Sequence, residues 1–390
     1  MDIHDKHSVL VTCAPGIASF LESELQALDF PILQRIKLGV FTKASLKDCL
    51  FLNMSLRTAY RVLLCVDKGK ANMPDDLYVH LNNIAWEQLI PPDGYLSVTS
   101  SVQTRAIRDT RFANLKTKDA IVDRINETRG RRPDSGPDRS RTVVFLYWKD
   151  KNYSIFLDTS GEPLYRRGYR KHSITAPMQE TLAAAILKAA HWPENGHLIN
   201  PMCGSGTLGI EAALMALDRA PGLLRSNYGF MHIRHFNRTR YQEIRSELRR
   251  KSQSSLPKGQ KIIMTDRDPN AVKAAQKNAR TAGVDHLISF QTCDFADTEI
   301  PPGPGIVILN PEYGVRMDQD SNLQKTYQRI GDFFKQKCPG YRGYIFTGNL
   351  DLTKKVGLRA DRRFIFYNGN IESRLLEYEI YEGSRRNKEE

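Results

Sequence analysis

The chain has 390 residues, of which 41% are hydrophobic and 26% are charged. This composition is typical of a folded protein with two or three domains and excludes wholesale disorder. The 57 Lys and Arg residues outnumber the 44 Asp and Glu residues, and the net charge of +13 favours a polyanionic partner such as a nucleic acid.

The cysteine and hydropathy patterns narrow the class of protein further. No apolar stretch approaches ~18 residues, which argues against an ordinary membrane-spanning helix. The six cysteines are scattered without a C-x-x-C pair, so no metal site is expected, and such scatter is typical of a reducing compartment. The first residues lack the pattern of a signal peptide. We therefore expect a cytoplasmic protein with no membrane partner.

The first part of the chain alternates short strands and helices, which predicts a small α+β region. The predicted strands cover residues 8–13, 35–42, 60–66 and 95–102, and the predicted helices cover 16–29, 46–54 and 116–128. A hairpin is predicted from 142–148 and 153–157, preceded by an exposed Arg-rich loop over 129–141.

Longer elements follow from about residue 170. Strands are predicted over 197–200, 261–265, 288–292, 305–309 and 344–347, and helices over 208–217, 269–282 and 323–337. A final antiparallel pair is predicted from 364–367 and 374–381. This alternation indicates an α/β fold with a mostly parallel sheet covered by helices on both faces.

A glycine-containing loop follows the first of these strands. In Pro201-Met202-Cys203-Gly204-Ser205-Gly206-Thr207, the two glycines let the backbone turn tightly and approach a ligand closely. The next two strands end at Asp266 and at Asp294-Phe295. Carboxylates at these strand ends can hold a ribose and an adenine amino group. Asp268 has two interpretations with equal weight, a cofactor ligand or a plain helix N-cap.

The loop differs from a dinucleotide-binding loop. It lacks G-x-G-x-x-G, and 60 residues separate Gly206 from Asp266, against ~20 in the dinucleotide pattern. No Walker A lysine follows the loop, so phosphate binding has no support. A nucleoside cofactor without a pyrophosphate fits better, and S-adenosylmethionine is the obvious one. The predicted cofactor residues are Pro201, Cys203, Gly204, Gly206, Thr207, Asp266, Asp268, Asp294, Phe295 and Asn310.

The fourth strand ends in Asn310-Pro311-Glu312-Tyr313-Gly314, which is the candidate catalytic segment. The side-chain oxygen of Asn310 and the carbonyl of Pro311 can both accept hydrogens of an exocyclic base amine. They would hold its nitrogen toward the methyl donor and stabilise the charge that develops there. Tyr313 can stack on an extruded base. An Asn-Pro turn with a buried Tyr is the weaker structural alternative.

Together these segments resemble the THUMP-containing class I RNA methyltransferases that methylate guanine N2, above all the N2-methylating part of the bacterial large-subunit rRNA enzymes. The matching segments are 164–170, 176–177, 182–185, 201–207, 211–213, 218–223, 266–269, 278–280, 310–314 and 358–361. The resemblance implies a ferredoxin-like subdomain over 1–68, a THUMP RNA-binding domain over 69–165 and a Rossmann-like, S-adenosylmethionine-dependent methyltransferase domain over 166–390.

Two positions depart from the family pattern. Asn200 stands where the family usually has Asp, so it is not expected to be a strong ligand. Glu312 replaces the second Pro of Asn-Pro-Pro-Tyr. Glu312 either faces the base and accepts guanine N1–H or points outward without effect, and the second interpretation has slightly more weight. The replacement could also mark a weakened catalyst.

Basic residues gather in two segments. Arg129, Arg131, Arg132, Arg166 and Arg170 are predicted to contact RNA, with Tyr147 and Trp148 as stacking partners of the loop at 129–141. The 218–258 insertion carries ten basic residues against three acidic ones, interleaved with Tyr228, Phe230, Phe236 and Tyr241. Basic residues interleaved with aromatic ones are typical of RNA contact. Because these segments lie in different halves of the chain, a bipartite RNA grip is expected.

The sequence therefore predicts an enzyme that methylates guanine N2 in 23S rRNA. The alternatives are the same reaction on tRNA, methylation of adenine N6, and a catalytically weakened RNA-binding or assembly protein. The sequence leaves the oligomeric state open.

Overall fold

The computed structural model describes residues 5–172, 178–312 and 320–381. The chain forms two compact units, and each is interleaved in sequence. The first unit contains Met1–Cys13, Leu21–Arg166 and Arg225–Leu248; the second contains Ala14–Phe20, Arg167–Leu224 and Arg249–Glu390. Most of the basic insertion therefore belongs to the N-terminal unit, although the sequence placed it within the C-terminal domain. None of the described helices has the length and apolarity that crossing a membrane requires.

The first unit is built on one eight-stranded sheet in the order β2-β3-β1-β4-β8-β7-β5-β6. Its strands are β1 (His7–Thr12), β2 (Ile32–Ile36), β3 (Gly39–Ala44), β4 (Arg61–Lys70), β5 (Tyr95–Gln103), β6 (Asp134–Ser135), β7 (Thr142–Lys149) and β8 (Asn152–Asp158). Strand β4 pairs antiparallel with β1 on one side and with β8 on the other. The expected domain boundary after residue 68 falls within this shared strand.

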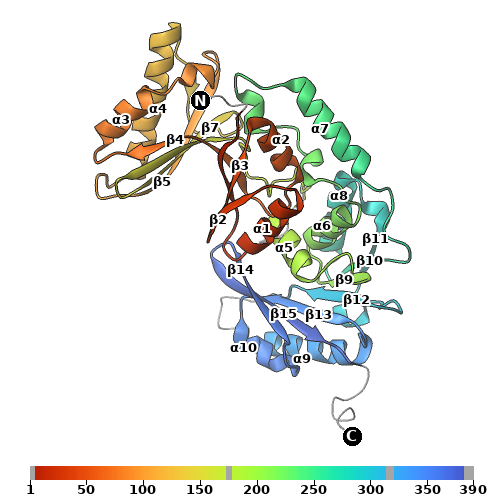
Figure 1. The fold of residues 1–390 in the computed structure, drawn as a ribbon. Helices are drawn as coiled ribbons and strands as arrows, with labels where there is room; N and C mark the ends of the chain where they lie inside the picture. The colour runs from red at the N-terminus through yellow and green to blue at the C-terminus, as the bar shows by residue number, and fades with distance from the viewer. Residues whose placement is uncertain (1–4, 173–177, 313–319, 382–390) are drawn as a thin grey trace. The chain divides into compact units, whose positions relative to one another are not determined.

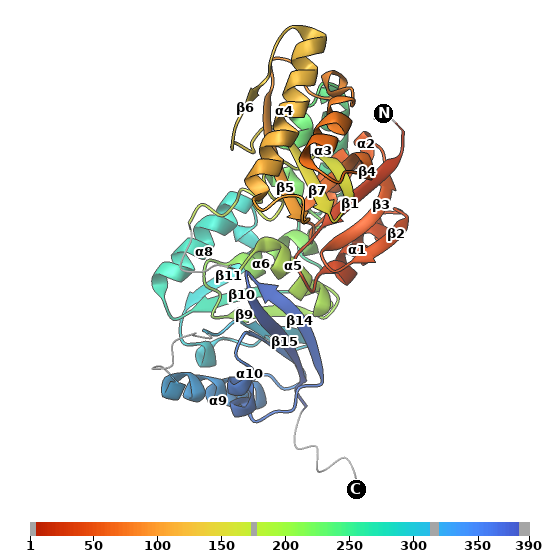
Figure 2. The same ribbon diagram turned by 90° about the vertical axis from the view of Figure 1, so that its left-hand side faces the viewer.

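The helices of the first unit follow from local capping and packing. They are α1 (Ala18–Ala27), α2 (Leu46–Ser55), α3 (Pro74–Asn82), α4 (Thr110–Arg129) and α7 (Arg238–Lys251), of which the start of α1 and the end of α7 belong to the second unit. A capping box between Ser45 and Asp48 begins α2, and the left-handed Gly130 ends α4. Helices α3 and α4 lie side by side in both views (Figures 1 and 2).

The prediction of a single strand over 35–42 is wrong. The structure has the hairpin β2–β3, in which Ile36 pairs with Gly39. The apolar residues keep a period of two through the turn, so the pattern hides the reversal. Helix α3 was not predicted, because its 9 residues include two adjacent acidic residues and only a short apolar face.

The second unit contains a seven-stranded sheet in the order β11-β10-β9-β12-β13-β15-β14. The strands are β9 (His197–Pro201), β10 (Ile262–Asp266), β11 (Ile288–Thr292), β12 (Gly305–Leu309), β13 (Arg342–Thr347), β14 (Arg362–Asn368) and β15 (Ile371–Glu379). Strands β9 to β13 are parallel, and β15 runs antiparallel to both β13 and β14. This confirms the predicted α/β sheet with an antiparallel final pair.

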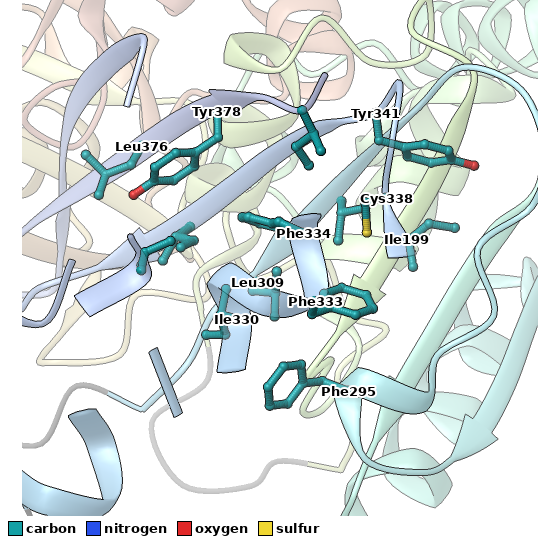
Figure 3. Close-up of a cluster of buried hydrophobic side chains, with 14 of the residues drawn as sticks. Ile199, Phe295, Leu309, Ile330, Phe333, Phe334, Cys338, Tyr341, Leu376 and Tyr378 are labelled. Carbon is teal, nitrogen blue, oxygen red and sulfur yellow. The ribbon is translucent and has the colours of Figure 1, made fainter. Parts of the chain in front are cut away.

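Helices cover both faces of this sheet. Helices α5 (Glu180–Ala189), α6 (Thr207–Ala216) and α8 (Pro269–Ala282) lie on one face, and α9 (Asp320–Lys337) and α10 (Leu350–Thr353) on the other (Figure 2). Figure 3 shows Phe333 and Phe334 of α9 packed toward Leu309 and Tyr378 of the sheet. All four side chains are at most 3% exposed. This core keeps the strands rigid, and the carboxyl ends of these strands carry the candidate site.

Candidate functional site

The candidate site lies at the carboxyl edge of the four parallel strands β9 to β12. Hydrogen bonds continue past the ends of the strands, from the Cys203 N–H to the Thr265 carbonyl (2.9 Å) and from the Cys293 N–H to the Asp266 carbonyl (3.1 Å). The loops that follow these strands are therefore held together at one edge. In open α/β sheets, ligands bind in the crevice at this edge.

The glycine loop after β9 is held in an uncommon backbone conformation. Met202, Gly204 and Gly206 all have positive φ angles, of 59°, 56° and 87°. A Cβ atom on Gly206 would lie 2.8 Å from the Cβ of Ala275, so this position requires glycine. A left-handed conformation at a non-glycine residue costs roughly 1–2 kcal/mol, and such strain clusters at functional sites. Met202 and the two glycines thus turn the chain sharply after β9, so the backbone can approach a ligand closely.

Asp266 joins the glycine loop to the end of β10. Its Oδ2 atom accepts the Gly204 N–H (2.9 Å), and its Oδ1 atom accepts the Asp268 N–H (3.0 Å). Each carboxylate oxygen keeps a further lone pair for a ligand hydroxyl. Asp266 therefore has a structural role that the sequence did not indicate, and its predicted role toward ribose stays a prediction. The neighbouring Asp268 is the N-cap of α8, because its side chain accepts the Asn270 N–H.

The remaining cofactor residues of the glycine loop are shielded. Pro201, Cys203 and Thr207 are buried. Burial raises the pKa of the Cys203 thiol, and the negative charge of Asp266 raises it further. The thiol is therefore neutral and unreactive at physiological pH, which agrees with a site that needs no nucleophilic sulfur.

The end of β11 carries a pair of residues held by α9. Asp294 Oδ1 accepts hydrogen bonds from the Ala296 N–H (3.0 Å) and from Arg329 (2.7 Å). The Arg329 guanidinium lies 4.9 Å from the centroid of the Phe295 ring, and Phe295 is itself 5% exposed in the core. Arg329, which sequence reasoning missed, thus orients the carboxylate that is predicted to accept from adenine.

The candidate catalytic segment leaves the sheet at the end of β12. Asn310 is half-buried, Pro311 is buried and Glu312 is exposed. The Oδ1 atom of Asn310 is shielded from solvent and has no hydrogen-bond partner among the described residues. An acceptor without a partner costs free energy unless a ligand donates to it. Tyr313 and Gly314 lie outside the described residues.

Asn200 has a role that explains its departure from the family pattern. Its side chain is 2% exposed, and its Nδ2 donates to the Ile308 carbonyl on β12 (2.9 Å). A carboxylate could not make this donation. The amide thus joins β9 to β12 two residues before Asn310, while its Oδ1 has no partner among the described residues.

Asn278 of α8 is a further residue that sequence reasoning did not assign to the site. It is fully buried and uses both ends of its amide. Its Oδ1 accepts the N–H groups of Lys171 and His172 (both 3.1 Å), and its Nδ2 donates to the carbonyls of His172 (2.8 Å) and Ser205 (3.0 Å). Asn278 therefore connects the glycine loop to the segment at 171–172. A polar residue on the alanine-rich buried face of α8 was the available signal.

Arg170 supports the same loop from the other side. Its guanidinium donates to Thr207 Oγ1 (3.1 Å) and pairs with Glu180 (3.0 Å). Burial raises the pKa of Glu180 to about 7, even though the charge of Arg170 opposes the shift. The Arg170 side chain is only 15% exposed, so these contacts indicate a role in positioning Thr207 rather than the predicted contact with RNA.

The other predicted RNA-binding residues are more accessible. Arg129 is in the last turn of α4, and Arg131 and Arg132 follow in the exposed loop. Arg166 is exposed and pairs with Glu162. Trp148, in contrast, is fully buried in the first unit, so the expectation that it stacks on RNA is wrong; Tyr147 is 38% exposed and keeps that prediction.

The basic insertion also differs from the sequence expectation. Tyr228, Phe230 and Tyr241 are at most 6% exposed, so they form a core and not a stacking surface, and only Phe236 is partly exposed. Residues 225–248 belong to the first unit, together with the arginines that follow α4. This segment therefore does not supply the second part of the expected bipartite RNA grip.

Three protein-family models match parts of this chain. Residues 167–377 match the UPF0020 family, described as an RMKL-like methyltransferase domain. Residues 8–63 match the RlmL ferredoxin-like domain, and residues 71–158 match the THUMP domain. Among the described residues, no group of three or more His, Cys, Asp and Glu side chains could hold a metal ion.

A curated relative matches almost the whole chain. The ribosomal RNA large subunit methyltransferase K/L of Syntrophotalea carbinolica is 35% identical over 379 residues, which is 95% of this chain and 53% of that protein. The chain thus spans about half the length of the curated relatives it matches.

Two solved structures extend the likeness to the fold. SMU.472, described as a candidate methyltransferase complexed with SAH, is 25% identical with a TM-score of 0.87, over 97% of this chain and 100% of that one. A protein of Listeria monocytogenes str. 4b F2365, described as a predicted N6-adenine-specific DNA methylase, is 26% identical with a TM-score of 0.86, over 96% of each chain. The expected ferredoxin-like, THUMP and class I methyltransferase architecture is confirmed.

Proposed function

Because the chain belongs to the UPF0020 family of RMKL-like methyltransferase domains, we propose that it transfers a methyl group from S-adenosylmethionine to the exocyclic N2 of a guanine in large-subunit rRNA. The RNA-binding part of the proposal rests on the THUMP match and on the net charge of +13. The relative that matches 95% of the chain is named a ribosomal RNA large subunit methyltransferase.

The residues at the strand edge fit S-adenosylmethionine. The left-handed glycine loop lets the backbone approach the ligand, Asp266 keeps lone pairs for the ribose hydroxyls, and Asp294, held by Arg329, can accept from the adenine amino group. The shielded Oδ1 of Asn200 is an acceptor that still lacks a donor among the described residues. When bound, this cofactor supplies a methyl group on a positively charged sulfur.

The single observation that carries the catalytic proposal is the shielded Oδ1 of Asn310 without a partner in the described chain. An amine of the base can donate to this atom and to the Pro311 carbonyl, so its nitrogen would be held in one orientation. Positive charge develops on that nitrogen as the methyl group arrives, and the two oxygens stabilise it. The neutral thiol of Cys203 takes no part in this chemistry.

The choice of guanine over adenine depends on groups beyond Asn310 and Pro311, since both amines can donate to the same oxygens. The relative's name specifies large-subunit rRNA but no base, whereas the Listeria neighbour is named for adenine N6 in DNA. The two products therefore have to be separated by experiment.

The test is to incubate the purified chain with S-adenosylmethionine and with rRNA or tRNA from a strain that lacks the gene. Digested nucleosides are then identified by mass spectrometry. We expect N2-methylguanosine in rRNA. N6-methyladenosine, or methylation of tRNA alone, would contradict the proposed substrate, and no product with either RNA would contradict the activity.

The variant Asn310→Ala tests the catalytic assignment. Loss of one stabilising group of this kind lowers turnover about 100-fold to 1,000-fold. We expect RNA affinity to stay within about twofold, and the exposed Asn270→Ala on α8 serves as the control that leaves turnover unchanged. Turnover of the Asn310→Ala variant within about threefold of the native rate would refute the assignment.

A further inference from the structure

A hollow of about 330 Å³ lies in the first unit, between residues 226–236 and the first two turns of α7. It is lined by Phe236 and Tyr241 together with Arg238, Gln242 and Arg245. Its volume is at the lower end of the range that small-molecule sites occupy. The sequence pattern had predicted RNA contact by basic and aromatic residues of this insertion, and the structure gathers several of them around one hollow.

The wall of the hollow is fixed by a buried arginine. Arg225 is 7% exposed and donates to the carbonyls of Pro163 (2.7 Å) and Glu162 (3.0 Å). Its guanidinium lies 4.8 Å from the centroid of the Tyr228 ring. These contacts attach the insertion firmly to the end of the segment that follows β8.

An aromatic cluster forms the floor. The rings of Tyr228 and Phe230 stack with centroids 4.8 Å apart. The centroid of the Phe230 ring lies 6.0 Å from that of Phe236 and 5.9 Å from that of Tyr241. Three of these four rings are buried, whereas Phe236 is only partly covered. Because the cluster holds Phe236 in place, a planar ligand could stack against it without the entropy cost of ordering that side chain.

Polar groups surround this ring. Arg245 donates to the Tyr241 hydroxyl (2.8 Å) and to the Arg225 carbonyl (3.2 Å), which fixes its guanidinium at the edge of the hollow. Arg238 and Gln242 are exposed at its mouth. Two guanidinium groups suit a phosphate, and the Gln242 amide can both donate to and accept from a base edge.

The surroundings are strongly basic. Helix α7 carries six basic residues against Glu243 and Glu247, and Arg240 already contacts both of these carboxylates (2.7 and 3.9 Å). The insertion is also tied to the THUMP region, since Thr142 of β7 donates to the His232 carbonyl (2.9 Å) and Arg234 donates to the Glu87 carbonyl (2.7 Å). The hollow therefore belongs to the same compact unit as the exposed arginines after α4.

We propose that this hollow binds one unpaired nucleotide of the RNA substrate, with the base against Phe236 and Gln242 and the phosphate between Arg238 and Arg245. This subsite rests on the proposed action on RNA, but it lies outside the methyl-transfer site. A stacked aromatic ring contributes sequence-tolerant affinity for single strands, since every base has a π-face. The subsite would thus select a loop or bulge of the RNA over a continuous duplex.

The test compares variants of the full chain in binding a labelled single-stranded RNA and a blunt RNA duplex of the same sequence, without cofactor. We expect Phe236→Leu to weaken single-strand binding about tenfold and duplex binding less than twofold, and Phe236→Tyr to retain native affinity. Arg238→Gln should weaken single-strand binding about fivefold. Arg240→Gln is the matched control, because that guanidinium is held by Glu243 and does not line the hollow; it should change binding less than twofold.

Photo-crosslinking gives a second readout that does not depend on a variant's stability. RNA containing 5-iodouridine should crosslink within residues 226–245 of the native chain, as mapped by mass spectrometry. Unchanged binding by Phe236→Leu, or crosslinks confined to other residues, would overturn the proposal. An acidic aromatic peptide that, when added before irradiation, prevented crosslinking at a lower concentration than unlabelled RNA would also overturn it and would assign the hollow to a protein partner.

These measurements need no methyl transfer. A result in which Phe236→Leu binds RNA normally while N2-methylguanosine is still formed would remove the subsite and leave the proposed function intact. The reverse result, with the expected loss of binding and no methylated product, would leave the subsite and remove the activity.

Discussion

Replacing Asn278 by alanine should weaken cofactor binding and not only stability. The native side chain is fully buried and makes four hydrogen bonds to backbone groups of Lys171, His172 and Ser205. At about 1 kcal/mol for each, the loss is about 4 kcal/mol. A domain of 150–250 residues loses roughly 2–4 °C in melting temperature for each kcal/mol, so the transition should fall by about 8–16 °C.

The consequence for the cofactor follows from the bond to Ser205. The carbonyl of Ser205 lies inside the glycine loop, between the left-handed Gly204 and Gly206. Without the Asn278 amide, the loop must be ordered by the ligand itself, and binding then carries that ordering cost. We expect the affinity for S-adenosylmethionine to fall about tenfold or more.

The assay is titration calorimetry with S-adenosylmethionine at 10 °C, a low temperature chosen to keep the destabilised variant folded, together with thermal denaturation followed by circular dichroism. Asn270→Ala is the matched control, since it makes the same change at an exposed position of the same helix. If Asn278→Ala does not fold, Asn278→Asp retains the two accepted hydrogen bonds and loses the two donated ones. A lowered melting temperature with unchanged cofactor affinity would refute the loop-positioning role.

Three further predictions concern charge. Burial raises the pKa of Glu180 from 4.5 to about 7, so the folded chain retains a proton that the unfolded chain releases; this stabilisation is complete below about pH 4.5 and is lost as the pH rises through 7. Between pH 5 and 8 this removes about 3 kcal/mol from the free energy of unfolding of the native chain. Replacing Glu180 by Gln should therefore reduce the fall in melting temperature over this pH range. Parallel curves of melting temperature against pH for the two proteins would contradict this. Glu312→Pro should change the ratio of guanine to adenine methylation if Glu312 accepts guanine N1–H, and an unchanged rate and base preference in a methyl-transfer assay would refute that recognition. Reversing Arg131 and Arg132 to Glu should weaken RNA binding and lower its salt dependence while cofactor affinity stays constant, as measured by RNA titrations between 50 and 200 mM salt; equal salt slopes for variant and native chain would count against it.

Much of the second unit could be read from the sequence because its signals are local. The strand that ends at Pro201, the glycine loop and the helix that begins at Thr207 are adjacent in sequence, and each depends on backbone preferences of its own residues. The same holds for Asp268, whose capping interaction reaches only two residues to Asn270. The carboxyl ends of parallel strands meet at one edge of the sheet, so the residues that follow successive strands could be named as candidates from the sequence.

The first unit was harder to predict, because some of its features depend on strand pairing and packing and not on local signals. The hairpin of β2 and β3 keeps the alternation of a single strand, so only the pairing of Ile36 with Gly39 reveals the turn. Trp148 alternates with exposed residues on β7, and the sequence could not show which face of that strand the helices cover. A residue's face becomes defined only when its sheet is packed.

By itself, the sequence determined the α/β alternation, the family resemblance and the residues at each strand end, because these depend on neighbours within a few positions. Only the tertiary structure decided which side chains hold those ends in place. Asn278 reaches Ser205 across 73 positions, and Arg225 reaches Pro163 across 62. Such partners are chosen by the folding of the whole chain, since a buried polar group must find a partner wherever the packed backbone presents one.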